Sequence, residues 1–284
     1  MPSMKALKRR ITSVNNTQQI MKAMNLVAAS KVQRNRTKLE SIRPMYDESK
    51  DFVKLGVANQ RGIESPYYEI RKVNRTAYIV IAGERGLCGS YNSNILKKAV
   101  AHMIDENKNE SIIAVGGKCK EYFVRRRKSV PHEHKGVLEH VHYSDATEIA
   151  QQAVDMYNSS DPDVRADEVY IAYTQFESLL SHTPSVIRLL PFEAPADDDR
   201  PEELYEPDVL TYLTKAVPIY LTMFVYGAMI ESAVCEQAAR MTSMDSAARN
   251  AGEIAEDLTL QYNRQRQGAI TQEISEIVGG ANAI

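Results

Sequence analysis

Residues 83–89 are the part of the chain whose composition could bind a phosphate group. They read GERGLCG, follow a β-branched run and precede a pattern with helical spacing. Backbone amides at a strand-to-helix turn of this kind can bind an anion. However, Gly83, Gly86 and Gly89 stand three residues apart, which matches neither G-x-G-x-x-G nor G-x-x-x-x-G-K-[ST]. We therefore predict a tight turn in which glycine supplies positive φ, not a nucleotide site.

Four histidines form a second group with possible chemistry. His132 and His134 make one H-x-H pair, and His140 and His142 make another. On a strand each pair faces one side, where imidazoles can bind a transition metal. The spacing matches no zinc signature and no cysteine lies nearby. We predict surface histidines on a hairpin.

Two further features could carry a reaction or bind nucleic acid. Cys88 has no adjacent base in the sequence, so we predict a small buried thiol and not a nucleophile. Residues 125–128 read RRRK, but residues 61–192 hold seventeen basic and seventeen acidic residues. A neutral domain favours a solvated helix end over a nucleic-acid site. The three cysteines of the chain are too few and too widely spaced for a disulfide framework or a zinc ribbon.

The positions of Gly and Pro divide the chain into helical ends and a mixed middle. Residues 3–43 contain neither residue, and residues 219–284 contain no Pro. Pro44 is expected to kink or interrupt the first helix, which then resumes to about residue 58. In the first segment the apolar positions have helical spacing: Met4, Leu7, Ile11, Val14, Ile20 or Met21, Met24, Val27, Ala28, Val32, Leu39 and Ile42.

The last segment continues the same spacing for much longer, with every step three or four residues. Its apolar or small positions are Leu213, Val217, Tyr220, Phe224, Gly227, Ile230, Val234, Ala238, Met241, Met244, Ala248, Ala251, Ala255, Leu258 and Tyr262. So long a helix needs a partner, and the N-terminal helix is available. The sequence does not fix their orientation, and we expect antiparallel pairing.

The middle of the chain predicts an α/β sheet. Strand patterns at residues 76–82, 111–115, 168–176 and 186–192 alternate with helical patterns at 91–105, 118–127 and 145–157, the last with Ser144 as N-cap. We therefore predict four parts. These are an N-terminal coiled-coil helix at 1–59, a Rossmann-like α/β domain at 74–192, an acidic connector at 193–208 and a C-terminal coiled-coil helix at 209–284.

Charge is unevenly spread over the 284 residues although the formal net charge is only −2. Residues 1–38 contain nine Lys or Arg and no acid, whereas residues 193–208 contain eight acids and one Arg. The apolar pattern runs unbroken through the basic segment, so we predict a helix that faces an acidic partner and not a transit peptide. The best apolar stretch, residues 221–230, is too short to span a bilayer.

The residues alone leave two other functions open. An α/β enzyme with helical dimerisation arms would need a catalytic constellation in residues 74–192, and we find none. A coiled-coil scaffold or nucleic-acid-binding protein with an α/β domain would use the basic N-terminus, with a steeply salt-dependent affinity for DNA.

Three motifs add a resemblance that covers nearly the whole chain. The first, RITSVNNTQQIMKAMNLVAASK, occupies residues 10–31, and the second is RGLCG at 85–89 with Tyr91 and Asn92. The third runs from residue 238 to the end and includes NAGE, LTLQYN and AITQEISEIVGG. With these motifs the chain resembles the gamma subunit of rotary F-type ATP synthases. It departs from the usual pattern at Glu84, where an Asp is usual.

The resemblance implies a fold and a set of partners. The terminal helices would form an antiparallel coiled-coil shaft inside a ring of three alpha and three beta subunits. The α/β domain would be a foot that rests with the epsilon subunit on the ring of c subunits. The subunit would be a non-catalytic rotor with no cofactor and no nucleic-acid partner. It would be peripheral to the cytoplasmic face of the bacterial membrane, with membrane contact only through the c ring.

The resemblance also implies contact residues and a mechanism. An asymmetric shaft would stabilise a different conformation of each catalytic subunit as it turns. Thr271 and Gln272 are expected to make polar contacts with the ring, and the uncharged residues 277–284 to turn in an apolar sleeve. Met24 and the segment 266–276 are expected to be coupling contacts. The individual ring contacts expected are Arg9, Arg10, Lys22, Met24, Lys31, Arg266, Thr271, Gln272, Glu273, Ile277 and Val278, and the expected foot turn is Arg85, Gly86, Leu87, Cys88 and Gly89.

Overall fold

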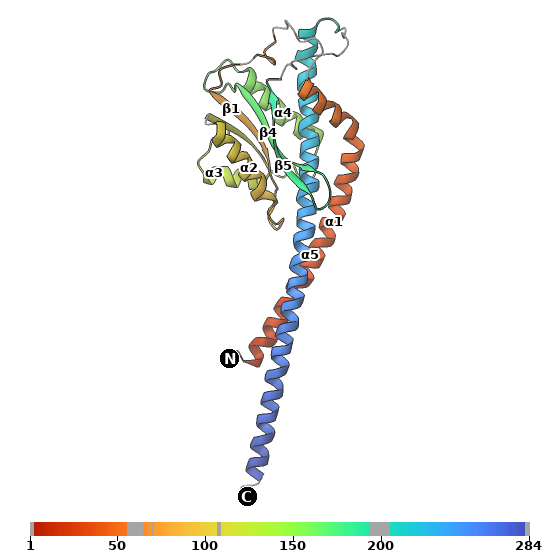
Figure 1. The fold of residues 1–284 in the computed structure, drawn as a ribbon, viewed down its shortest axis with the longest axis vertical. Coiled ribbons are helices and arrows are strands. Elements are labelled where there is room, and N and C mark those ends of the chain that lie inside the picture. Colours follow the sequence, from red (N-terminus) through yellow and green to blue (C-terminus); the bar gives the residue numbers. More distant parts are fainter. Residues whose placement is uncertain (1–2, 56–64, 70, 107–108, 193–204, 282–284) are drawn as a thin grey trace. The chain divides into compact units, whose positions relative to one another are not determined.

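The computed structural model describes residues 3–55, 65–69, 71–106, 109–192 and 205–281 (Figure 1). Its contacts divide the chain into two units, one made of Met1–Ala29 with Arg240–Ile284 and the other of Ser30–Ala239. Two helices, α1 (Met4–Leu55) and α5 (Val209–Ala281), contribute to both units. The end of the predicted first helix at residues 56–59 and most of the predicted acidic connector lie outside the described residues.

The second unit is built on a five-stranded sheet, which confirms the predicted α/β class. Its strands are β1 (Arg75–Ile81), β2 (Asn109–Val115), β3 (His132–His134), β4 (Glu168–Phe176) and β5 (His182–Leu190). They lie in the order β3-β2-β1-β4-β5, with β5 antiparallel to β4 and the other pairs parallel.

Helices cover both faces of the sheet, which explains why β1 is apolar without alternation. Alternate strand residues such as Tyr78 and Ile112 pack with α2 (Tyr91–Glu106) and α3 (Gly117–Arg125) on one face. The residues between them pack with α4 (Tyr143–Asn158) and α5 on the other face (Figure 1).

Several predicted boundaries differ from those in the structure. The prediction omitted β3 and began β5 four residues too late. Residues 182–185 read HTPS, without a large apolar side chain, and they pair with β4. The N-cap of α4 is His142 and not Ser144, because the His142 amide donates to the Asp145 carboxylate at 3.3 Å. Short or polar strands give little side-chain signal because backbone pairing alone holds them.

α1 passes through Pro44 as one helix, so the predicted interruption is wrong. Proline removes one backbone hydrogen bond, but Tyr46, Ser49 and Phe52 beyond it are buried. The Phe52 ring stacks on Tyr220 of α5 with ring centroids 4.0 Å apart. Tertiary packing therefore holds the helix beyond the proline.

Tyr46 of α1 packs directly on the α5 backbone at Gly227. A Cβ atom at Gly227 would lie 2.1 Å from the Tyr46 ring, so only glycine fits there. The Tyr46 hydroxyl donates to Glu231 at 3.0 Å, and Lys50 lies 3.9 Å from the other oxygen of that carboxylate. Since Phe52 meets Tyr220 and Tyr46 meets Gly227, α1 and α5 are antiparallel in this unit.

The high hydropathy of part of α5 is explained by burial inside the structure. Among the described residues α5 is the one helix with an 18-residue window apolar enough to cross a membrane, and 78% of that window is buried inside the structure. Runs of consecutive apolar residues, the best of which is 221–230, predict no membrane-spanning stretch, so the window average differs from that prediction. The helix buries apolar side chains on several sides because it contacts both α1 and the sheet.

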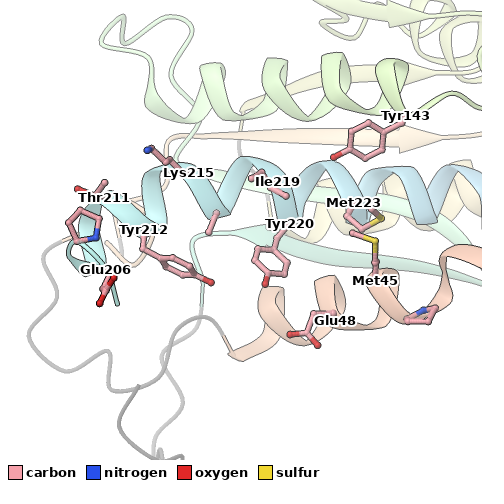
Figure 2. A pocket seen from close by; sticks show the side chains of 13 residues that line it. Met45, Glu48, Tyr143, Glu206, Thr211, Tyr212, Lys215, Ile219, Tyr220 and Met223 are labelled. Carbon is pink, nitrogen blue, oxygen red and sulfur yellow. The ribbon is translucent and has the colours of Figure 1, made fainter. Parts of the chain in front are cut away.

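An apolar groove of about 680 Å³ lies where the first turns of α5 pass α1 and α4 (Figure 2). Met45, Ile219 and Met223 supply apolar side chains, and Tyr143 and Tyr220 supply aromatic rings. Met45 and Ile219 are 61% and 59% exposed. The groove is an open apolar surface of this unit.

We predict that Gly227→Ala lowers the free energy of unfolding by about 1–3 kcal/mol, because the new methyl group displaces the Tyr46 ring. Denaturant unfolding followed by circular dichroism measures the change. Gly268→Ala is the matched control, because nothing lies within 4 Å of its added Cβ in the same helix. A Gly227→Ala chain as stable as the wild type would contradict the packing.

We predict a pH-dependent contribution from Glu231. Burial raises the pKa of this carboxyl above its ordinary value of 4.5, although Lys50 and the Tyr46 hydroxyl act in the opposite direction. A raised pKa means that the contribution of Glu231 to stability is present below pH 4.5 and is lost as pH rises through the folded-state pKa. Glu231→Gln should therefore become more stable relative to wild type between pH 4.5 and 7. Unfolding curves across this range would refute the assignment if the difference stayed constant.

Candidate functional site: the terminal helices and the turn after the first strand

Two side-chain amides fix the pairing of α1 with α5 in the first unit. Gln18 donates to the Ala248 carbonyl at 3.1 Å, and Asn25 donates to the Met241 carbonyl at 2.8 Å. The two pairs of residue numbers each add to 266, so the helices are antiparallel and in one register. This confirms the predicted antiparallel pairing.

The seam between these helix segments has heptad spacing. Buried and half-buried positions of α1 alternate by four and three residues, which is the period of a two-stranded coiled coil. They are Leu7, Ile11, Val14, Gln18, Met21, Asn25 and Ala28, facing Met244, Ala248, Ala251, Ala255 and Leu258 of α5.

Three residues predicted for the α1 stripe lie outside the seam. Met4, Ile20 and Val27 are 39%, 60% and 57% exposed. A single partner helix covers only two positions in each heptad, so apolar residues beside those positions stay in solvent. Every predicted α5 position in this unit, from Met241 to Tyr262, is buried or half-buried.

The predicted basic contacts on α1 are available to a partner. Arg9, Arg10 and Lys22 are exposed, and the described residues offer them no ion pair. Met24 is half-buried next to the seam residue Asn25. Lys31 belongs to the other unit, so the structure does not bring it together with this group.

The predicted contacts at the end of α5 lie beyond the start of α1. With pair sums of 266, Met4 at the start of α1 is level with Tyr262. From there on α5 has no α1 beside it, and the predicted contacts there are exposed. They are Arg266, Thr271, Gln272, Glu273, Ile277 and Val278. Gln272 donates to Glu276 at 2.9 Å, one turn along the helix.

Two residues of this segment lie within the predicted contact segment 266–276 but were not named individually as contacts. Ile270 and Ile274 are 47% and 56% exposed, and with Ile277 and Val278, at 71% and 53%, they form an apolar stripe at helical spacing. The stripe continues past the last residue that α1 can cover. In the sequence, the signal for this exposed stripe is that the C-terminal helix pattern is longer than the N-terminal one that pairs with it. A contiguous exposed apolar stripe marks an interaction surface.

The turn after β1 also presents an exposed apolar residue. Leu87 is 61% exposed and has φ 63°, a conformation that non-glycine residues rarely adopt. Of the three glycines, Gly89 has positive φ, at 56°. Arg85 forms an exposed ion pair with Glu139 at 2.7 Å, and Cys88 is buried. The predicted tight turn is present, with glycine at positive φ at Gly89, and the strained residue is Leu87.

Side chains of the chain itself occupy the places where this turn could bind a phosphate. A Cβ at Gly83 would lie 2.9 Å from the Glu236 carboxyl of α5, and the Gly83 amide donates to Asn92 at 2.7 Å. The Glu84 carboxylate accepts the Gly117 amide at the start of α3, at 2.9 Å. This crowding agrees with the mismatch to both nucleotide motifs.

The remaining candidates have structural partners. His132 and His134 lie on the parallel edge strand β3 and not on a hairpin, and buried His134 is 2.8 Å from Gln152. No group of three potential metal-ligating side chains occurs among the described residues. Arg126 lies 3.6 Å above the Tyr122 ring, and Lys128 pairs with Glu110.

The thiols are also structural, which fits the prediction for Cys88. Cys88, Cys119 and Cys235 are buried and unbridged. Burial raises the pKa of the Cys119 and Cys235 thiols well above the ordinary range. Such thiols stay protonated and are poor nucleophiles.

Comparisons with known proteins agree over the full length. A family model described as ATP synthase matches residues 3–284. The chain is 41% identical to the ATP synthase gamma chain of Desulforamulus reducens and 38% identical to that of Pelotomaculum thermopropionicum, covering 100% of each chain in both cases.

Solved structures give the same fold at lower identity. A chain from the Euglena gracilis mitochondrial ATP synthase, OSCP/F1/c-ring, rotational state 3, has a TM-score of 0.71 and 18% identity, covering 99% of this chain and 94% of that one. A chain from the central stalk/c-ring of the Tetrahymena thermophila mitochondrial ATP synthase has a TM-score of 0.59 and 24% identity, covering 80% and 99%.

We predict that Asn25→Ala weakens the helix pair of the first unit by about 0.5–1.5 kcal/mol, because the bond to Met241 is lost. Asn16→Ala on the exposed side of α1 is the matched control, since both variants gain the same helix propensity. Hydrogen exchange of the α1 amides measures the difference. Equal exchange in the two variants would show that the Asn25 bond contributes nothing.

Proposed function

The chain belongs to the ATP synthase gamma-chain family, and we propose that the exposed residues of its helices and turn are its contacts with the other subunits. As a gamma chain it is a non-catalytic subunit of the synthase. It is the central rotor that couples ion flow through the membrane ring to ATP synthesis or hydrolysis. This replaces the enzyme, scaffold and nucleic-acid hypotheses.

One observation carries the proposed contact with the ring of alpha and beta subunits. From Arg266 to Val278, α5 extends past the start of α1 and exposes an apolar stripe. A surface of this kind is stabilised when a partner covers it. In a rotor the covering surface must also let the helix turn. Apolar contacts suit this, because turning breaks no ion pair.

The basic side chains of α1 supply the second part of the ring contact. Arg9, Arg10 and Lys22 face solvent and are free to pair with acidic groups of the ring. Exposed ion pairs contribute only about 0–1 kcal/mol each. Such pairs exchange readily as the rotor turns, while their sum still favours one orientation. We assign Met24 and Lys31 to the same contact on the resemblance of their motif.

The other unit is the proposed foot of the rotor. Its turn Arg85–Gly89 exposes Leu87, and its groove at Met45, Ile219 and Met223 exposes further apolar surface (Figure 2). We assign these surfaces to neighbouring subunits of the synthase, with epsilon and the c ring as the partners of the foot. The chain would then be peripheral to the cytoplasmic face of the membrane, touching it only through the c ring.

The mechanism follows from differential contact. A gamma chain has no symmetry, so three identical catalytic subunits meet three different faces of it. Each face stabilises one conformation of its neighbour, and rotation shifts those populations in sequence. As a non-catalytic subunit the chain carries out no reaction itself, and its side chains set which conformation each neighbour adopts.

We predict that Thr271→Ala with Gln272→Ala lowers torque and coupled ATP synthesis by about two- to tenfold, the effect of losing a hydrogen bond or two. The variant is assembled with three alpha and three beta subunits, and co-purification checks assembly. Gln261→Ala, exposed on α5 where α1 lies alongside, is the matched control. Unchanged torque and synthesis in a fully assembled double variant would remove both residues from the contact.

A further inference from the structure

The Glu84 carboxylate joins three loops at one edge of the sheet. Glu84 itself lies in the turn between β1 and α2. One carboxylate oxygen accepts the Gly117 amide at 2.9 Å, at the first residue of α3, where the loop after β2 ends. The other accepts the Leu138 amide at 3.4 Å, in the loop between β3 and α4. A single half-buried side chain therefore ties its own turn to both neighbours.

The bond to Gly117 places a negative charge at the start of α3. The first amides of a helix have no partner within the helix, and the helix dipole favours an anion beside them. The N-cap Gly116 has no side chain to fill this role, and its φ of 96° leaves no room for one. The Glu84 carboxylate, which comes from another loop, therefore supplies the negative charge beside the N-terminus of α3.

Neighbouring contacts attach the same turn at further points. The Lys118 amide donates to the Gly83 carbonyl at 3.0 Å. Arg85 pairs at 2.7 Å with Glu139, which follows Leu138 in the third loop. Asn92 donates to the Arg85 carbonyl at 3.2 Å. Glu84 is the member of this set that contacts both neighbouring loops through charged hydrogen bonds.

Leu87 explains why the turn needs such support. Its φ of 63° is strained, and its side chain is 61% exposed, so neither backbone preference nor burial holds it. Strained backbone persists only where surrounding contacts determine it. The turn would relax if those contacts were removed.

We propose that Glu84 is a positioning residue whose carboxylate fixes the turn Arg85–Gly89 in the conformation that presents Leu87 to an apolar surface of a neighbouring subunit. The inference rests on the proposed function of that turn as a subunit contact. Glu84 itself touches no partner; it acts through Leu87.

The first test uses the isolated full-length chain. In Glu84→Ala, hydrogen exchange at the Gly117 and Leu138 amides should become about ten- to a hundredfold faster, the effect of losing a charged hydrogen bond. Sodium formate should slow exchange again by supplying a carboxylate, whereas sodium chloride at equal ionic strength should not. Asp163→Ala, an exposed acid on another loop, is the control and should leave both amides unchanged. Unchanged exchange in Glu84→Ala, or rescue by chloride as well as formate, would overturn the inference.

The second test uses the assembled, membrane-reconstituted complex and reads ions pumped for each ATP hydrolysed. Glu84→Ala should lower this ratio and formate should restore it, while Leu87→Ala should lower it with no rescue. Wild type in formate is the control. If Leu87→Ala lowered the ratio while Glu84→Ala left it normal, the positioning role of Glu84 would be refuted, and the turn would still stand as a subunit contact. A normal ratio in Leu87→Ala would instead refute the turn as a subunit contact.

Discussion

The close contact of the Tyr46 ring with the backbone at Gly227 is what allows the two terminal helices and the sheet to share one core. Phe224 lies edge-on to both Tyr46 of α1 and Tyr173 of β4, with ring centroids 5.9 and 6.1 Å away. A side chain at position 227 would separate α1 from α5 and break this sequence of rings. The buried Tyr46–Glu231 hydrogen bond then makes the arrangement specific, because a buried carboxylate needs its partner.

The α/β unit shows how a sheet of this topology can serve without a nucleotide. In open parallel sheets the carboxyl ends of the strands usually hold the ligand. Here that edge is filled by Glu84 from the turn, Asn92 from the first turn of α2 and Glu236 from α5. Helix α5 therefore has two roles in this unit, as a cover for one face of the sheet and as part of the filling of its edge.

Much of this fold could be predicted from the sequence because the relevant patterns are long. Burial sets the α5 spacing over many turns, and every predicted position from Leu213 to Tyr262 is buried or half-buried. The β-branched run of β1 is equally clear. The edge strand at His132–His134 was missed because three residues give no periodicity, and backbone pairing with β2 holds it.

The candidate site was less accessible to sequence reasoning. Exposed charges such as Arg10 have no pattern that separates a contact from a solvated face, and it was the family motif that led to their prediction as contacts. Ile270 and Ile274 lie in the predicted contact segment 266–276 but were not singled out, because their spacing continues that of the seam. Only the register of the helix pair shows that α1 has ended before them.

That register also determines how the helix pair responds to a twisting or pulling force. Gly252 leaves room for the Gln18 amide, whose nitrogen would lie 2.7 Å from an added Cβ. If one helix slid along the other by seven residues, Gln18 would meet Asp245 or Thr259 in place of Gly252, and the apolar seam would still match. A Cβ at that position would crowd the Gln18 amide, so this side chain would have to turn away from the backbone carbonyl that it bonds. The native register is therefore the one in which Gln18 keeps its hydrogen bond, and this preference opposes sliding when a load is applied to one helix.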